Sequence, residues 1–170
     1  CSVLMVRSRN PDNYRLSNIF WEHTIRLDLH PKDKWEAIDQ MVDVLVEEKQ
    51  VPPSQREMVL AAARRREEKY STSIGRETAI PHAPLPDLPG IIGAFGVCPE
   101  GVEFNGLNGD VIRYIFLLLT PQQNYRTYIP VLAQIASLMH TEETRSAILH
   151  CETPSELTAL IKNQERANAS

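Results

Sequence analysis

Cysteine is scarce in this sequence of 170 residues, because Cys1, Cys98 and Cys151 are few, odd in number and far apart. They form neither a disulfide framework nor a set with metal-ligand spacing, which favours a reducing compartment. Apolar runs are short as well, and the longest, near residues 91–97 and 114–119, have only the length of strands. We therefore expect no direct insertion into a membrane and, with no signal-peptide pattern, a cytoplasmic location.

The common catalytic signatures are also missing. The chain contains no P-loop, no dinucleotide-binding glycine motif and no G-x-S-x-G sequence. No paired histidines and no cluster of cysteine and histidine are present, so we expect neither a metal nor a cofactor. The net charge is −4, from 18 basic and 22 acidic residues, which argues against nucleic acid as the main partner.

The composition that remains is that of an ordinary globular domain, with 42% apolar and 24% charged residues. Residues 1–14 are interpreted as a tail or linker end, and residues 15–165 as one domain. The chain begins at Cys1 rather than Met, which is consistent with trimming or excision from a longer protein. We predict an α/β (α+β) fold, a three-layer sandwich with a mixed sheet of about four or five strands and helices on both faces.

Hydrophobic periodicity places the expected elements. Alternation or a continuous apolar run predicts strands, whereas apolar residues at helical spacing predict helices. Val111–Leu119 is nearly all apolar and is predicted to be central in the sheet. Ser54 and Glu57 form a capping-box pattern that predicts a helix start. The expected strands are 24–29, 78–80, 90–97 and 111–119, and the expected helices are 33–49, 54–69, 127–139, 142–149 and 153–162.

The segment Ala79-Ile80-Pro81-His82-Ala83 contains the most informative residue type. A neutral imidazole is a good nucleophile near neutral pH, because its reference pKa is about 6.5. Pro81 fixes the backbone, and the two alanines leave room on either side of His82. Such a ring would have to protrude enough for two partners to reach it in turn. These features make His82 a candidate acceptor of a phosphoryl group.

Phosphoryl transfer depends mainly on positioning and electrostatics, so donors for the phosphoryl oxygens are needed near the histidine. Ser71, Thr72, Ser73 and the Gly75 amide form a candidate donor loop upstream of it. Arg66, at the end of the second predicted helix, could supply a guanidinium fork. We expect this loop, His82 and the segment 120–128 to lie together at one edge of the sheet.

Each of these features also has a purely structural interpretation. A single histidine after a proline is usually a surface turn residue, and a cluster of Ser and Thr is often only a loop. The charged run Arg64–Lys69 is more often a solvated helix end, where cations are favoured by the helix dipole, than an electropositive docking face.

Taken together, the pattern resembles a known family. Arg66-Glu67, Ser71-Thr72-Ser73-Ile74-Gly75 and Ala79-Ile80-Pro81-His82 resemble the signature of the fructose/mannitol-type enzyme IIA domain of the bacterial sugar phosphotransferase system, a family that includes nitrogen-regulatory IIA proteins. The resemblance covers nearly the whole chain, through further matches at 16–20, 102–109 and 115–121. It implies that HPr or a paralogue phosphorylates His82, that Arg66 is the family arginine, and that a IIB domain or a regulated transporter or kinase is the next partner.

One position departs from the family pattern. Tyr128 stands where family members have a second histidine, in a His-Leu-x-x-Leu-Ala-x-Leu stretch. A tyrosine hydroxyl can donate a hydrogen bond but is neutral at pH 7, so Arg126 is a candidate for compensation. Two hypotheses follow. The first is a phosphotransferase domain with a phosphohistidine intermediate, sugar-specific or nitrogen-regulatory, and the alternative is a non-catalytic IIA-like regulatory or interaction domain.

Overall fold

Two long antiparallel strands, β5 (Ile92–Asn105) and β6 (Asp110–Pro121), form the middle of the sheet. The computed structural model describes residues 14–105 and 110–169. Along β6, Ile115, Leu117 and Leu119 enter the hydrophobic core on one face of the sheet, and Tyr114, Phe116 and Leu118 enter the core on the other. A strand buried on both faces requires a continuous apolar run, so the predicted central position of 111–119 is confirmed.

Within the described residues the sheet is mixed and has six strands, whereas the sequence predicted the positions of four. The order is β1-β5-β6-β3-β2, with β4 also paired to β6. β1 (Ile25–Arg26) runs parallel to β5, β3 (Thr78–Ala79) and β4 (His82–Leu85) run parallel to β6, and β2 (Ser73–Gly75) is antiparallel to β3. The additional strands are β2 and β4, which the sequence analysis treated as loop. The expected strand at 24–29 is reduced to β1.

Strands β3 and β4 continue each other along the same side of β6. Ala79 pairs with Ile115 and His82 with Leu118, so the register is unchanged across the intervening Ile80 and Pro81. Pro81 has no N–H to donate, but its carbonyl accepts a hydrogen bond from the Leu118 amide at 2.9 Å. The expected strand over 78–80, ending at Pro81, agrees with β3, which ends at Ala79, but the sequence did not predict that pairing with β6 resumes at His82.

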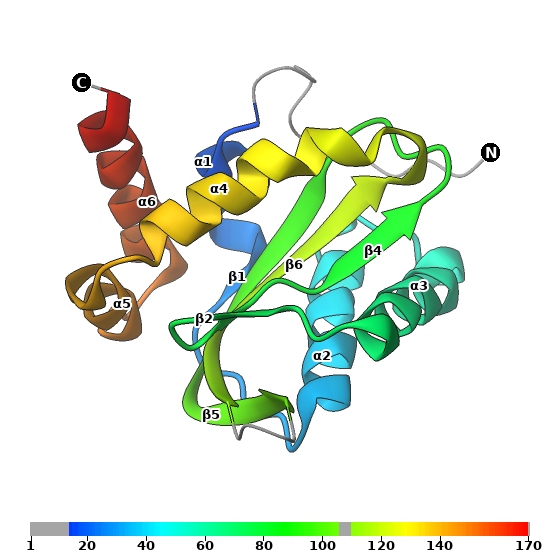
Figure 1. Ribbon diagram of the computed structural model, residues 1–170, viewed down its shortest axis with the longest axis horizontal. Coiled ribbons are helices and arrows are strands. Elements are labelled where there is room, and N and C mark those ends of the chain that lie inside the picture. The colour runs from blue at the N-terminus through cyan, green and yellow to red at the C-terminus, as the bar shows by residue number, and fades with distance from the viewer. Residues whose placement is uncertain (1–13, 106–109, 170) are drawn as a thin grey trace.

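Helices cover both faces of the sheet, as predicted (Figure 1). One face is packed by α2 (Lys34–Glu47) and α3 (Arg56–Lys69). The other is packed by α1 (Leu16–Ile19), α4 (Ile129–Leu138), α5 (Glu142–Leu149) and α6 (Pro154–Ala169). In the described part of the chain, no helix combines the length and apolar character that a bilayer crossing requires.

Helix ends show where local signals were sufficient. Asp33 caps α2 as expected, accepting a hydrogen bond from the Glu36 amide at 2.8 Å, and α5 has the predicted bounds. The capping box at Ser54 was wrong, because a 3₁₀ turn, Pro53–Gln55, precedes α3. α4 starts later than expected, after the 3₁₀ segment η3 (Gln122–Tyr128), and α6 runs on to Ala169. The predicted tail falls almost wholly on residues outside the described part, as do 106–109 of the expected middle turn.

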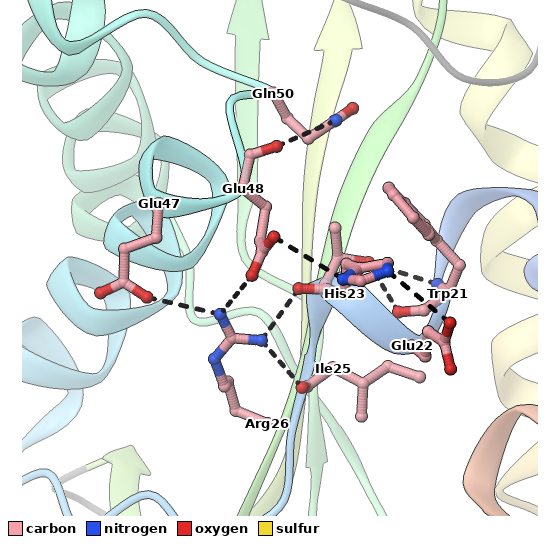
Figure 2. A network of polar contacts seen from close by, with 9 residues as sticks. Trp21, Glu22, His23, Ile25, Arg26, Glu47, Glu48 and Gln50 are labelled. Carbon is pink, nitrogen blue, oxygen red and sulfur yellow. Dashed lines mark hydrogen bonds and ion pairs between the residues drawn. The ribbon is translucent and has the colours of Figure 1, made fainter. Parts of the chain in front are cut away.

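A polar network ties the short strand β1 to the end of α2 (Figure 2). The Arg26 guanidinium donates to the carbonyls of His23 and Ile25 at 2.9 and 3.1 Å, and to the carboxylates of Glu47 and Glu48 at 3.3 and 3.1 Å. The 3₁₀ turn η1 (Glu22–Thr24) supplies the first carbonyl. This network holds an edge strand of only two residues in its register.

Candidate functional site

His82 lies in β4, with its side chain on the α4 side of the sheet. Successive side chains of a strand point to opposite faces. Ala79 and Ala83 belong to the core under α2 and α3, and Ile80 belongs to the core under α4, so His82 shares the face of Ile80. The residue is only 8% exposed. It is therefore a buried strand residue, neither the protruding ring nor the surface turn residue that the sequence suggested.

Neither ring nitrogen of His82 has a hydrogen-bond partner among the described residues. Buried polar groups are normally satisfied, so two unpaired nitrogens on one buried ring are unusual and point to a ligand or a chemical role. Burial, and to a lesser degree the Arg66 guanidinium, lowers the pKa of His82 from its ordinary 6.5 to about 4, while the nearby Ile80 carbonyl, which is not in hydrogen-bonding geometry with the ring, offsets part of this shift. The imidazole is consequently neutral, with a free lone pair, throughout the physiological pH range.

The ring lines a cavity of about 520 Å³. Four parts of the fold form its walls: β4, the end of α3, the strand β2 with its flanking residues, and the apolar side of α4. The lining residues are Arg66, Ser71, Thr72, Ser73, Ile74, Gly75, Arg76, Ile80, His82, Ile129, Leu132, Ala133, Ala136 and Met139. His82, the candidate donor loop and Arg66 are thus brought together at one edge of the sheet.

A buried carboxylate holds the donor loop in place. Glu67 accepts hydrogen bonds from the Thr72 amide at 2.9 Å and from the Thr72 hydroxyl at 2.6 Å. Lys34 lies 3.9 Å from the same carboxylate. Burial raises the pKa of Glu67, and the two bonds from Thr72 oppose that shift. The Thr72 hydroxyl is therefore committed to the loop anchor, and the Thr72 and Ser73 amides donate to Glu67 and to the Ser71 hydroxyl oxygen, which leaves the Ser71 and Ser73 hydroxyls as candidate donors toward the cavity.

Arg66 is held at the cavity wall by its own helix end. Its Nη1 donates to the Tyr70 carbonyl at 3.0 Å, where α3 ends. No ion pair of Arg66 is found within the described residues, so the guanidinium retains donors for an anion.

Tyr128 contacts the candidate nucleophile directly. The rings of His82 and Tyr128 lie edge to face, with centroids 5.1 Å apart and planes at 70°. The tyrosine hydroxyl does not bond to either ring nitrogen, because both are without a partner among the described residues. Arg126, the predicted substitute for the missing histidine charge, is exposed on η3 and is not one of the residues that line the cavity.

Two residues at or beside the cavity, Glu67 and Arg76, were not predicted from the sequence to belong to the site. Glu67 was quoted only as part of a motif, although a carboxylate five residues before Thr72 is a possible local signal for the loop anchor. Arg76 gave no signal, because a turn residue before a strand is usually solvated. In the described segments, no three or more His, Cys, Asp or Glu side chains gather where they could hold a metal ion.

Comparison with known proteins decides the family. The family described as "Phosphoenolpyruvate-dependent sugar phosphotransferase system, EIIA 2" matches residues 18–164. The chain belongs to this family. It contains an EIIA-type domain of the phosphotransferase system, which confirms the resemblance seen in the sequence. Only residues 1–17 and 165–170 lie outside the match.

The relatives of this EIIA domain include sugar-specific and regulatory proteins. The chain is similar to the fructose-specific EIIABC component of Bacillus subtilis, with 28% identity over 89% of the chain and 24% of the relative. It is also similar to the nitrogen regulatory protein of Escherichia coli K12, with 23% identity over 93% of the chain and 96% of the relative. The domain spans about a quarter of the Bacillus subtilis protein and 51% of the nitrogen regulatory protein of Bradyrhizobium diazoefficiens.

Solved structures share the fold of this EIIA domain. Nitrogen regulatory protein IIA-Ntr from Neisseria meningitidis superimposes with a TM-score of 0.76 at 24% identity, over 86% of this chain and 98% of that one. IIA mannitol from Escherichia coli gives a TM-score of 0.70 at 23% identity, over 82% and 96%. A further structure is a complex of Escherichia coli enzyme IIA mannitol with phosphorylated IIB mannitol, with a TM-score of 0.69 at 22% identity over 85% and 99%.

Proposed function

We propose that His82 accepts a phosphoryl group from a cytoplasmic HPr-type carrier and passes it to a IIB domain or uses it to regulate a partner. The observation that carries this proposal is the buried, neutral imidazole with two unpaired nitrogens on the wall of an open cavity. Membership of the EIIA family supports phosphoryl transfer as the reaction. The relatives include both a fructose-specific protein and a nitrogen regulatory protein.

The transfer step uses the free lone pair of His82. One ring nitrogen attacks the phosphorus, a new N–P bond forms, and the bond from phosphorus to the nitrogen of the donor histidine breaks. The bonding electron pair returns to the donor ring, which takes up one proton from solvent to leave as neutral imidazole, and the proton on the other nitrogen of His82 is released to solvent, so that the phosphorylated ring is neutral. The lowered pKa of His82 favours this step, because no proton has to leave the attacking nitrogen beforehand.

Residues of the cavity wall would stabilise the negative charge of the phosphoryl oxygens. Arg66 and the donors of Ser71 and Ser73 lie where oxygens of a group on His82 would be received. Hydrogen bonds to charged groups are the stronger ones, and in a partly dry cavity they need no rearrangement during transfer. The proposed role of the Glu67–Thr72 bonds is to keep these donors in position.

The test is phosphorylation with phosphoenolpyruvate, enzyme I and HPr, followed by mass spectrometry. One acid-labile phosphoryl group is expected on the wild type and none on His82→Ala. The matched control is His150→Ala, because His150 is an exposed histidine at the end of α5, and its variant should be labelled like the wild type. Labelling of His82→Ala would place the acceptor elsewhere.

The neutral Tyr128 beside His82 is the observation that favours the alternative, a domain that binds a partner without transfer. That alternative predicts no label on the wild-type protein under conditions in which a control IIA domain is labelled. A measurable rate on His82 excludes it as the main function.

A further inference from the structure

The β2–β3 hairpin has an unusual turn. Its two central residues, Arg76 and Glu77, both have left-handed backbone angles, with φ of +54° and +59°. Two-residue hairpin turns of this kind normally use Asn or Gly, since other residues are strained there. Here neither central position is glycine, so the chain keeps two charged side chains at a conformational cost.

Glu77 has a structural reason to be there. Its carboxylate pairs with Arg113 at 2.9 Å, and its carbonyl accepts hydrogen bonds from the amides of Arg113 and Tyr114 at 2.9 and 3.0 Å. The turn is closed further by the Thr78 hydroxyl, which donates to the Arg76 carbonyl at 2.9 Å. These contacts fix the turn to β6 and determine where Arg76 lies.

The Arg76 side chain makes none of the contacts that fix the β2–β3 turn. It is exposed, and within the described residues its guanidinium has no hydrogen bond and no ion pair. It nevertheless lines the same cavity as His82. The strain at Arg76 is therefore not explained by any contact of its side chain within the described fold.

The charge of the cavity makes this placement informative. Arg66 and Arg76 are the two charged residues in its lining, and no acidic residue lines it. Tyr128, which contacts the ring, is neutral at pH 7. Arg66 is the cation that helps to lower the pKa of the resting His82, and Arg76 is an exposed residue of the same cavity lining. The buried ring with unpaired nitrogens independently marks the cavity as a ligand site.

We propose that Arg76 is a second phosphate-binding arginine, which contacts the oxygens of the incoming phosphoryl group at the mouth of the cavity that His82 lines. This inference rests on the proposed function, since it assigns a second cation to the same transfer. A guanidinium presents several donors in one plane and suits phosphate oxygens. The long side chain on a fixed turn reaches the donor without disturbing the neutral state of His82.

A small phosphoryl donor isolates this role from protein docking. With phosphoramidate whose amino group is protonated, a ring nitrogen of His82 attacks phosphorus, the bond from phosphorus to that NH3⁺ group breaks, and neutral ammonia leaves with the bonding electron pair. The proton on the other ring nitrogen passes to solvent. Because this donor has no protein surface, any dependence of its rate on Arg76 reports contact with the phosphoryl group itself.

The experiment compares three variants with the wild type. Arg76→Asn keeps a residue that tolerates the left-handed turn and removes the guanidinium. Arg76→Lys keeps the charge without the fork. Arg65→Gln is the matched control, because Arg65 is an exposed arginine of α3 that does not line the cavity. Measured are the rate of phosphoramidate labelling at His82, the melting temperature, and the titration of His82 by NMR.

We expect Arg76→Asn to lower the labelling rate about tenfold, as loss of one charge-assisted hydrogen bond implies. Arg76→Lys should be intermediate and Arg65→Gln unchanged. The titration midpoint of His82 should be the same in all four proteins. A wild-type rate in Arg76→Asn overturns the inference, and so does an equal loss in Arg65→Gln, which would indicate general electrostatic attraction only.

Failure of the proposed function has a different signature. If wild-type His82 is not labelled at all, the same variants are titrated with inorganic phosphate, with the Gly75 amide and the His82 ring as NMR probes. Weaker phosphate binding in Arg76→Asn than in the wild type then retains Arg76 as an anion-binding residue without transfer. Equal binding, or none, overturns the inference as well.

Discussion

The rings of Tyr128 and His82 meet edge to face with centroids 5.1 Å apart, and Tyr128 stands where the family pattern has a second histidine. A pair of aromatic rings in this geometry is favourable beyond the area that it buries. Tyr128 therefore contributes to the dryness of the His82 environment, and its hydroxyl remains available for a group that arrives on the ring.

The hydroxyl and the ring of Tyr128 are separable by substitution. Tyr128→Phe keeps the edge-to-face contact, so its melting temperature should equal that of the wild type, while the phosphorylation rate should fall because a donor is lost. Tyr128→His should raise the rate, most visibly below about pH 6.5, where imidazole gains its charge. Unchanged rates in both variants would show that Tyr128 acts only by packing.

The buried His82 should make the protein less stable in mild acid. Its folded pKa is about 4 and its ordinary value is 6.5, so between these values the unfolded chain binds more protons. Stability therefore falls as pH is lowered from 6.5 to 4, by about 3 kcal/mol in the limit. Urea unfolding of the wild type and His82→Gln at pH 7 and pH 4.5 should show a smaller pH effect in the variant. Parallel pH profiles would contradict this assignment.

Arg66 should shift the titration of His82 without affecting the fold. Arg66→Gln removes the cation that helps to lower the pKa of His82, so that pKa should rise toward its ordinary value while burial still keeps it low. The phosphorylation rate should fall and the melting temperature should change little, because the Arg66 side chain bonds only the Tyr70 carbonyl. NMR titration is the measurement, and a titration midpoint that does not move would remove Arg66 from the vicinity of the ring.

Glu67 should matter for stability and for the loop together. Glu67→Ala leaves the Thr72 amide and hydroxyl without their acceptor in a buried place, which should cost about 2–4 kcal/mol of unfolding free energy. Its neighbour Glu68 is exposed, so Glu68→Ala is the matched control and should stay within about 0.5 kcal/mol of the wild type. Denaturant unfolding measures both. Equal stabilities would mean that the loop does not depend on the carboxylate.

The titration of Glu67 changes folding stability with pH in the opposite direction to the titration of His82. Its pKa is raised in the folded protein, so its contribution to stability is fully present below the ordinary value of 4.5 and is lost as pH rises through the folded value. The comparison of wild type with His82→Gln cancels this term, because both proteins contain Glu67.

The fold could be predicted where one local rule decided. The apolar run Tyr114–Leu119 is typical of a strand buried on two faces, and Asp33 begins a helix because its side chain accepts a hydrogen bond from the Glu36 amide. The helix start predicted at Ser54 was wrong because Pro53 favours a 3₁₀ turn before α3. β4 was not predicted because Pro81 lacks an N–H and ordinarily marks the end of a strand, whereas its carbonyl still accepts from the Leu118 amide and pairing resumes at His82.

The sequence predicted which residues lie together at the site better than it predicted their burial and hydrogen bonds. The motif brought His82, Arg66 and the 71–75 loop together, since each lies near the others in sequence. The burial of His82 and the committed hydroxyl of Thr72 depend on packing against α4 and on Glu67, which no local pattern specifies. Arg76 became visible only with its backbone angle and its place on the cavity wall.

Because β3 and β4 share one register against β6, the number of residues between Ala79 and His82 decides which face of the sheet the His82 side chain occupies. Removal of one residue between Ala79 and His82 would leave a strand able to pair with β6, yet it would exchange the two faces, so that Ala83 faced α4 and the imidazole entered the core under α2 and α3. Removal of two residues would restore the face but displace the ring by roughly 6.7 Å along the strand. Insertions and deletions at this point would therefore abolish the site even where the sheet itself could absorb them.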